Sequence, residues 1–208
     1  MTDLPTLIAA FTAMFIVIDP IGLAPLFIAM TQGMSQAQRR AIGVRACTVA
    51  IGLLLLFAVF GEALLEFIGI SMPAFRIAGG VLLFITALDM LFERRQARRQ
   101  DNADDAVDPA HDPSIFPLAI PLIAGPGAIA TIILLTGQAD SALGFGAVLG
   151  VMILVIAMVF AMFMAAGLLE RLLGKTGINV VTRLLGMLLA ALSVQFILDG
   201  LKGFGLAG

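Results

Sequence analysis

Two long apolar segments of this 208-residue chain are each interrupted near the middle by proline and glycine. The first interruption covers residues 19–25 (DPIGLAP), and the second covers residues 124–128 (AGPGA). Proline has no backbone N–H and glycine weakens a helix, so helical hydrogen bonding is disturbed at both places. Within a bilayer, such broken backbone is tolerated only where it lines a buried cavity. The pattern therefore predicts two helices broken inside a membrane, with both breaks lining one cavity.

The composition is typical of an integral membrane protein. Hydrophobic residues make up 61% of the chain and charged residues only 12%, whereas soluble domains have about 45–50% and about 25%. The formal net charge is -2 and no basic face is evident, which argues against nucleic-acid binding. The bilayer is the first partner that this composition predicts.

Six apolar runs approach or exceed the length of about 20 residues that a transmembrane helix needs. They cover 5–31, 41–68, 73–92, 115–138, 142–169 and 180–201. The predicted fold class is an all-α membrane protein, with six transmembrane helices in a single transmembrane domain (1–208) and with helices 1 and 4 broken at the bilayer midplane.

The basic residues predict how the chain is oriented. Ten of the twelve Lys and Arg residues lie in or beside the loops that follow spans one, three and five. Basic residues concentrate in cytoplasmic loops, so loops 32–40, 93–113 and 170–179 are predicted to be cytoplasmic. Both termini are then periplasmic, and the expected location is the bacterial inner (plasma) membrane.

The two halves of the chain match weakly at a nearly constant offset. Pro20 matches Pro126 at an offset of 106 residues, and Arg76 matches Arg183 at 107. Each half has three spans, so the second half must enter the membrane from the opposite side. This predicts an inverted-topology repeat, an architecture that supports alternating access. The predicted parts are repeat 1 (1–92), a cytoplasmic linker (93–113) and repeat 2 (114–208).

Asp19 is the main candidate for chemistry because it lies near the midpoint of the first span. A carboxylate inside a bilayer is costly, which makes it a functional-site hypothesis by default. It could bind a substrate ammonium group or carry the coupling proton. The alternative is a structural role, in which Asp19 accepts hydrogen bonds from amides at the start of the next helix. One carboxylate could do both.

The helices that resume after Gly22 and Gly127 would point their positive N-terminal ends at the cavity. Such ends bind carboxylates through backbone amides. The alternative is a pair of structural proline kinks. Thr131 follows the second break by one turn, and Gln195 is a polar residue of the last span. The predicted substrate-binding residues are Asp19, Pro20, Gly22, Gly125, Pro126, Gly127, Thr131 and Gln195.

Other classes of site have little support. The single histidine, His111, lies in a polar loop, and the single cysteine, Cys47, lies in an apolar run, so no metal site is expected. No cofactor motif is present. Enzymatic chemistry normally needs at least two convergent reactive groups, and Asp19 is alone near the midplane of its span, so no catalytic residues are expected.

Several groups of residues occur together in this chain. They are Asp19-Pro20-Ile21-Gly22 with Pro25, Gly69-Ile70-Ser71, Arg76-Ile77-Ala78-Gly79-Gly80, Pro121 with Ala124-Gly125-Pro126-Gly127 and Ile129-Ala130, and Gln195-Phe196-Ile197 with Gly200. With these motifs the chain resembles the MarC family of bacterial inner-membrane proteins. The resemblance covers nearly the whole chain apart from the linker, and it implies six transmembrane helices in two inverted repeats. It also implies transport of small neutral amino acids such as glycine and alanine, driven by a cation gradient, with protons as the expected ion.

One position departs from the family pattern. Many members have Asn directly after the glycine of the first break, where this chain has Leu23. Some members also carry Asn at the position of Asp19, which bears on a general proton-carrier role for that residue.

The predicted function is secondary active transport of a small zwitterion by alternating access, with a neutral amino acid as substrate. The alternatives are a passive channel, an exporter of another small solute, an intramembrane enzyme and a non-transporting assembly factor. The sequence leaves open the direction of transport, the exact substrate, the coupling ion and whether the chain forms a homo-oligomer.

Overall fold

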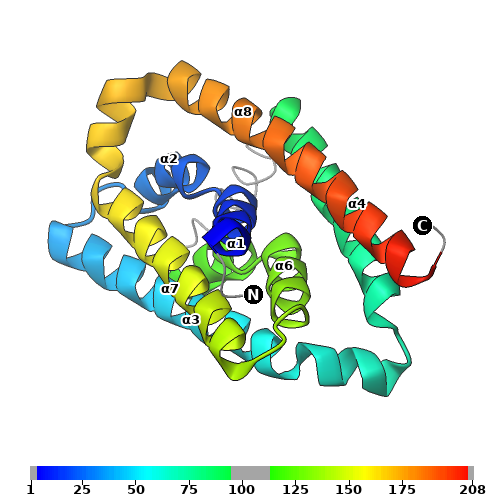
Figure 1. The fold of residues 1–208 in the computed structure, drawn as a ribbon. Helices are drawn as coiled ribbons and strands as arrows, with labels where there is room; N and C mark the ends of the chain where they lie inside the picture. Colours follow the sequence, from blue (N-terminus) through cyan, green and yellow to red (C-terminus); the bar gives the residue numbers. More distant parts are fainter. Residues whose placement is uncertain (1–3, 95–112, 206–208) are drawn as a thin grey trace.

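The computed structural model describes residues 4–94 and 113–205, and all regular structure in these ranges is helical (Figure 1). The all-α class predicted from the sequence is confirmed. The elements are α1 (Leu4–Ile18), α2 (Pro20–Met30), α3 (Gln36–Ile68), α4 (Met72–Leu91), η1 (Ser114–Ile123), α6 (Pro126–Thr136), α7 (Ala142–Met164) and α8 (Ala166–Gly203).

Five helical segments of the described chain are long and apolar enough to cross a membrane. A sixth is obtained if η1 and α6, which meet at a bend of 56°, are counted as one span. Helices α1 and α2 together form the first segment, Leu4–Met30, and the last segment is the Thr176–Gly203 part of α8. These lengths and compositions are those of a multi-pass membrane protein.

Two of the predicted loops are shorter than the sequence indicated. Residues 170–179 were predicted to be a loop, but they belong to α8, which is kinked at Gly174 (φ 60°, ψ 178°). Loop 32–40 is reduced because α3 begins at Gln36, after a capping box formed by Ser35 and Gln38. Hydropathy detects only the apolar part of a helix, so polar turns that extend it were missed. Linker residues 95–112 lie outside the described residues.

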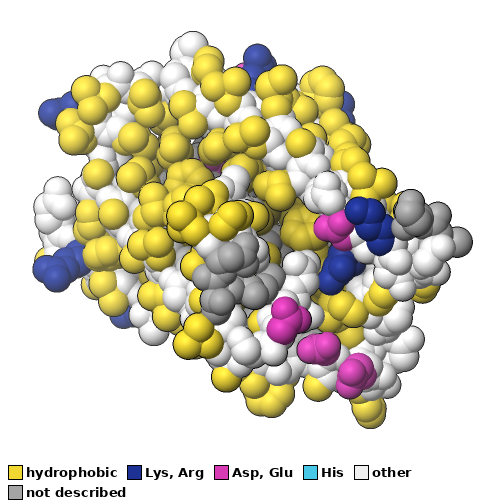
Figure 2. All heavy atoms as spheres, viewed as in Figure 1, with side chains coloured by type: hydrophobic (Ala, Val, Ile, Leu, Met, Phe, Trp, Pro, Cys, Tyr) yellow, Lys and Arg dark blue, Asp and Glu magenta, His cyan; other side chains and the backbone are white. Residues whose placement is uncertain are grey.

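Helices α1, α2 and α6 occupy the middle of the molecule, with α3 and α7 along one side and α4 and α8 along another (Figure 1). In the most apolar window of the α1–α2 segment, 61% of residues are buried, compared with 28% for the α3 and α4 segments. The outside is correspondingly apolar, as Figure 2 shows for one face, and Phe67 and Leu143 are 89% and 72% exposed. The first broken segment is therefore central, and the other helices surround it.

Packing occurs mainly between the two halves of the chain. Helix α3 packs against η1, α6 and α7, while α7 packs against α1, α2 and α3. Helix α4 packs against α6 and α8, and α8 packs against α2 and α4. These contacts place the two broken segments between the same outer helices.

Helices α4 and α8 cross closely at small residues. A β-carbon built on Gly80, Gly186 or Gly200 would lie within 3.2 Å of a carbonyl oxygen of the opposite helix. Residues near the start of α4 meet the end of α8, so the two helices are antiparallel. Small residues of this kind let membrane helices approach each other closely. The three carbonyls belong to Ser193, Ala87 and Pro73, respectively.

Candidate functional site

The first break is a joint of one residue between α1 and α2. Asp19 adopts a left-handed conformation (φ 60°, ψ 65°). Its backbone N–H still donates to the carbonyl of Phe15 (2.9 Å), and its own carbonyl accepts from the N–H of Leu23 (3.1 Å). Main-chain hydrogen bonding therefore continues on both sides of Asp19, although Pro20 has no N–H to donate. The disturbance of helical hydrogen bonding predicted at this break therefore does not extend to the backbone N–H and carbonyl of Asp19.

The Asp19 carboxylate caps α2 from inside the protein. Its Oδ1 accepts a hydrogen bond from the N–H of Gly22 at 3.0 Å, and the residue is 0% exposed. A β-carbon on Gly22 would collide with this carboxylate. The capping role considered for Asp19 is thus present in the structure, and glycine at position 22 makes room for it.

The second break is wider and has no side-chain cap. Gly125 precedes α6 in an extended conformation (φ -82°, ψ 173°), and no side chain caps the helix at this residue. The first amides of an α-helix, including that of Gly127 here, have no acceptor within the helix itself. A β-carbon on Gly125 would lie 2.5 Å from the carbonyl oxygen of Pro121. Glycine is therefore required at position 125 by the close approach of η1.

The two breaks lie next to each other in the interior. A β-carbon built on Gly127 would lie 3.1 Å from Cγ1 of Val17, two residues before Asp19. The same position is 3.5 Å from Leu83 and 4.0 Å from Oγ1 of Thr86, both on α4. The start of α6, the end of α1 and the middle of α4 thus meet at one point. Val17, Leu83 and Thr86 were not among the predicted site residues, because nothing in an apolar span marks a residue that contacts a distant break.

Thr131 and Gln195 use their polar groups on their own helices. Thr131 is 0% exposed, and its hydroxyl donates to the carbonyl of Gly127 at 2.8 Å. Gln195 is exposed, and its Nε2 donates to Asp199 Oδ1 at 2.8 Å. Thr131 therefore supports the first turn of α6 directly beneath the break. Gln195 differs from the buried residues at the breaks, and its place in the site stays a prediction.

The remaining predicted residues differ in exposure. Pro20 and Gly125 are buried, whereas Pro126 is exposed at the start of α6. Leu23, which stands where many family members have Asn, is 0% exposed.

Within the part of the chain that is described, no three His, Cys, Asp or Glu side chains are placed to share a metal ion.

Comparison with known proteins decides the family. The model of the MarC family integral membrane proteins matches residues 4–204. The chain belongs to the MarC family. The MarC chain is 36% identical to the UPF0056 membrane protein YvbG of Bacillus subtilis, covering 95% of this chain and 94% of that protein. It is 38% identical to a UPF0056 membrane protein of Archaeoglobus fulgidus (93% and 91% covered) and 34% identical to YhcE of Escherichia coli (97% and 94%). No solved structure matches it.

Proposed function

We propose that this MarC chain is a secondary active transporter of small neutral amino acids, of the glycine and alanine type, and that transport is coupled to protons. The observation that carries the proposal is the contact between the two breaks, where Gly127 of α6 lies against Val17 of α1. A buried carboxylate and a helix end without a side-chain cap are found at this junction. Together they offer one group for an ammonium and one for a carboxylate.

The two ends of a zwitterion would bind to different breaks. The N-terminus of α2 is already capped by Asp19, whose carboxylate accepts from Gly22. The N-terminus of α6 has no such cap and carries the partial positive charge of a helix start. The substrate carboxylate would therefore bind to the first turn of α6, and the ammonium would bind to Asp19. A proton taken up by Asp19 would replace the ammonium when the substrate leaves.

We also propose that the two halves are inverted repeats whose relative motion alternates access to the junction. The packing supports this, because each outer helix contacts its counterpart in the other half and the broken segment of the other half. Gly79 of α4 matches Gly186 of α8 at the offset of 107 residues, and these helices cross antiparallel. Contacts that exchange between halves in this way are those of a two-fold arrangement.

The predicted orientation belongs to this proposal, with residues 32–40, 93–113 and 170–179 on the cytoplasmic side and both termini outside the inner membrane. Arg39 near the start of α3 and Arg171 near the start of α8 lie in the first and third of these segments, and both line one pocket. This shared pocket supports placing both segments on one side of the membrane, as proposed from the distribution of basic residues.

The test is uptake of radiolabelled glycine and alanine into proteoliposomes, with and without an inward proton gradient. The matched variant is Asp19→Asn, because the Asn side-chain oxygen can still accept from Gly22 and Asn tolerates a left-handed conformation. We expect the wild-type protein to accumulate substrate above its external concentration only when the gradient is present. We expect the variant to fold normally and to lose this accumulation.

Other outcomes discriminate against the proposal. Uptake that equilibrates without accumulation would indicate a passive channel. Full gradient-driven accumulation by Asp19→Asn would assign Asp19 to capping alone. If the folded wild-type protein takes up neither substrate, the amino-acid assignment is wrong, and Leu23 is the first position at which to look for altered specificity.

A further inference from the structure

A second candidate site lies where the ends of α2, α3, α7 and α8 meet. It is a cavity of about 260 Å³, lined among others by Phe27, Arg39, Phe163 and Arg171. Each half of the chain contributes one arginine and one phenylalanine. Phe27 follows Asp19 by eight residues along α2, which corresponds to about 12 Å of helix. This cavity, the arginine pocket, is therefore separate from the junction of the two breaks.

Arg39 is held in place by the end of α2. Its Nε donates to the carbonyl of Thr31 at 3.3 Å, and the Thr31 hydroxyl donates to the carbonyl of Phe27 at 2.7 Å. Among the side chains that the structure describes, none is a hydrogen-bond or ion-pair partner of the Arg39 Nη groups or of the Arg171 guanidinium. The N–H donors of these groups are therefore available to a ligand.

The inner wall of the pocket is a pair of stacked rings. Phe27 and Phe163 are 4.3 Å apart between ring centroids and nearly parallel, with an interplanar angle of 4°. Both are almost completely buried, whereas Arg171 and Gln36 on the pocket lining are exposed. The pocket therefore opens at its polar end and ends at an apolar wall toward the interior.

We propose that the arginine pocket binds the carboxylate of a small soluble solute on the side predicted to be cytoplasmic. Guanidinium groups bind planar oxyanions through paired hydrogen bonds, and the Gln36 amide adds another donor. Among the described residues that line the pocket, none is acidic. Four helices enclose the pocket, so it suits a compact anion. Anion binding to the arginine pocket does not depend on the transport proposal. The use of the pocket as an entry site for substrate does rest on that proposal.

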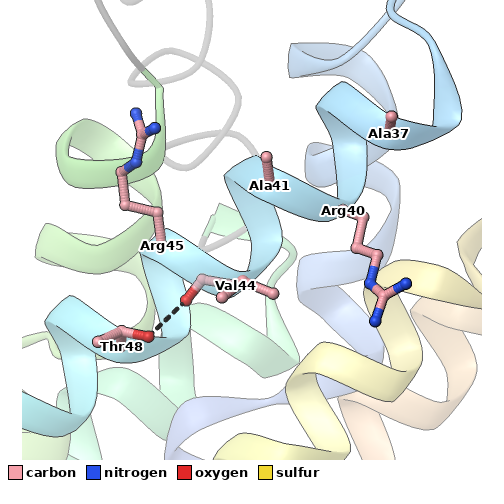
Figure 3. A pocket seen from close by; sticks show the side chains of 6 residues that line it. All are labelled: Ala37, Arg40, Ala41, Val44, Arg45 and Thr48. Carbon is pink, nitrogen blue, oxygen red and sulfur yellow. Dashed lines mark hydrogen bonds between the residues drawn. The ribbon is translucent and has the colours of Figure 1, made fainter.

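A larger cavity, on α3, also contains two arginines but is not enclosed by several helices in the way the arginine pocket is. This groove has a volume of about 630 Å³ and runs along one face of a single helix (Figure 3). Arg40 and Arg45 flank it and point away from each other, while the Thr48 hydroxyl donates to the carbonyl of Val44 at 2.8 Å. A compact anion could not reach both guanidinium groups there. Arg40 is therefore a matched control, because it is an exposed arginine beside Arg39 that does not line the arginine pocket.

Binding can be measured with the purified full-length protein and acetate as the probe. The sole cysteine, Cys47, is buried, so its reaction with a maleimide dye on heating reports unfolding. At constant ionic strength, we expect acetate to raise the melting temperature of the wild-type protein in a saturable manner relative to chloride. We expect Arg171→Gln to abolish this shift and Arg40→Gln to retain it. Equal shifts in both variants would overturn the proposal.

A second variant adds a large side chain to the pocket lining and leaves both arginines in place. Gly167 lies on the lining, and a β-carbon built there meets nothing within 4 Å. We expect Gly167→Leu to keep the melting temperature in chloride and to lose the acetate shift. An unchanged acetate shift in this variant would place the anion elsewhere and overturn the proposal.

Two further measurements distinguish the ligand and its use. If phosphatidylglycerol, but not phosphatidylcholine, stabilises the protein through Arg171 and acetate does not, the ligand is a lipid headgroup and the soluble-carboxylate assignment is wrong.

The use of the pocket can be tested in proteoliposomes in which the protein has one known orientation. We expect Arg171→Gln to raise the KM for glycine at least about tenfold when glycine is added on the side of the membrane where the arginine pocket opens, and not on the other side. The kcat should be unchanged, as for one lost charge-assisted hydrogen bond. A KM raised equally from both sides would overturn the use of the pocket as an entry site. Failure of the wild-type protein to transport would refute only the transport proposal, because the acetate shift is independent of it.

Discussion

The two helix breaks occupy matching positions in the two halves, but they solve the same backbone problem differently. At the first, Asp19 supplies both the left-handed residue and the carboxylate that caps α2. At the second, η1 and α6 meet at 56° and Gly125 offers no side chain to the start of α6. One break therefore contains its own capping carboxyl group, whereas the other leaves a helix start without a side-chain cap.

Breaks at corresponding positions of the two halves can therefore have different functions. Two helix ends of equal charge would be suited to one symmetric anion. A carboxylate on one side and an uncapped helix start on the other are suited to a molecule with both an ammonium and a carboxylate. If the two breaks differ in this way, the stability of each should depend on its own residues.

The largest effect is expected at the second break. In Gly125→Ala, the new β-carbon would lie 2.5 Å from the Pro121 carbonyl oxygen, which is backbone and cannot rotate away. We expect the free energy of unfolding to fall by about 3 kcal/mol, as for an overpacked buried site. Unfolding by SDS titration, followed through the reactivity of Cys47, measures this. Gly146→Ala is the control, since its β-carbon meets nothing within 4 Å, and it should not destabilise the protein. Equal stability of the two variants would contradict the packing of η1 on Gly125.

At the first break, the effect should depend on the substituted side chain. Asp19→Ala removes the acceptor for the Gly22 amide and forces alanine into a left-handed conformation. We expect a loss of about 2 kcal/mol in the free energy of unfolding. Asp19→Asn keeps the acceptor and should remain within about 0.5 kcal/mol of the wild-type protein. The same SDS titration compares them, and equal losses for Ala and Asn would show that the charge, rather than the cap, stabilises this break.

Much of this arrangement could be predicted from the sequence. Pro20 and Pro126 within apolar runs are local signals, and the structure begins α2 and α6 at these residues. Hydropathy missed the polar first turn of α3 and the polar residues 170–179 of α8, because it measures transfer into lipid and does not detect helix outside it. The Ser35–Gln38 capping box was a usable signal for the start of α3, and it was not used.

The contacts that join the two breaks were beyond prediction from the sequence. Nothing local indicates that Gly127 lies against Val17 and Leu83, since apolar side chains in a span can face lipid or protein equally well. The exposure of Gln195 was likewise unpredictable, because its partner Asp199 is on its own helix. A polar residue in a span is a weaker indicator of a site than a break, because a neighbouring turn can satisfy its hydrogen bonds.

A smaller and coupled effect is expected at Gly22. A β-carbon there collides with the Asp19 carboxylate, which can rotate away only by giving up its bond to the Gly22 amide. We expect Gly22→Ala to lower the free energy of unfolding by about 1 kcal/mol. The effect should nearly vanish in an Asp19→Ala background, where the colliding atoms are gone. A double-mutant cycle measures this coupling. Strict additivity of the two changes would mean that Gly22 matters for backbone reasons unrelated to the cap.

The smallest effect is expected for Gln195. Its side chain is exposed and its amide donates to Asp199 four residues along α8, whereas the residues that join the breaks are buried. Gln195→Leu should change the free energy of unfolding by no more than about 0.5 kcal/mol, and it should leave the KM for glycine nearly unchanged. Gly127→Leu, which places a large side chain against Val17 and Leu83, is the comparison and should abolish transport. If Gln195→Leu instead raises the KM as strongly as Asp19→Asn, α8 would have to rotate toward the breaks during transport. The asymmetric pair of breaks would then be only part of the binding site.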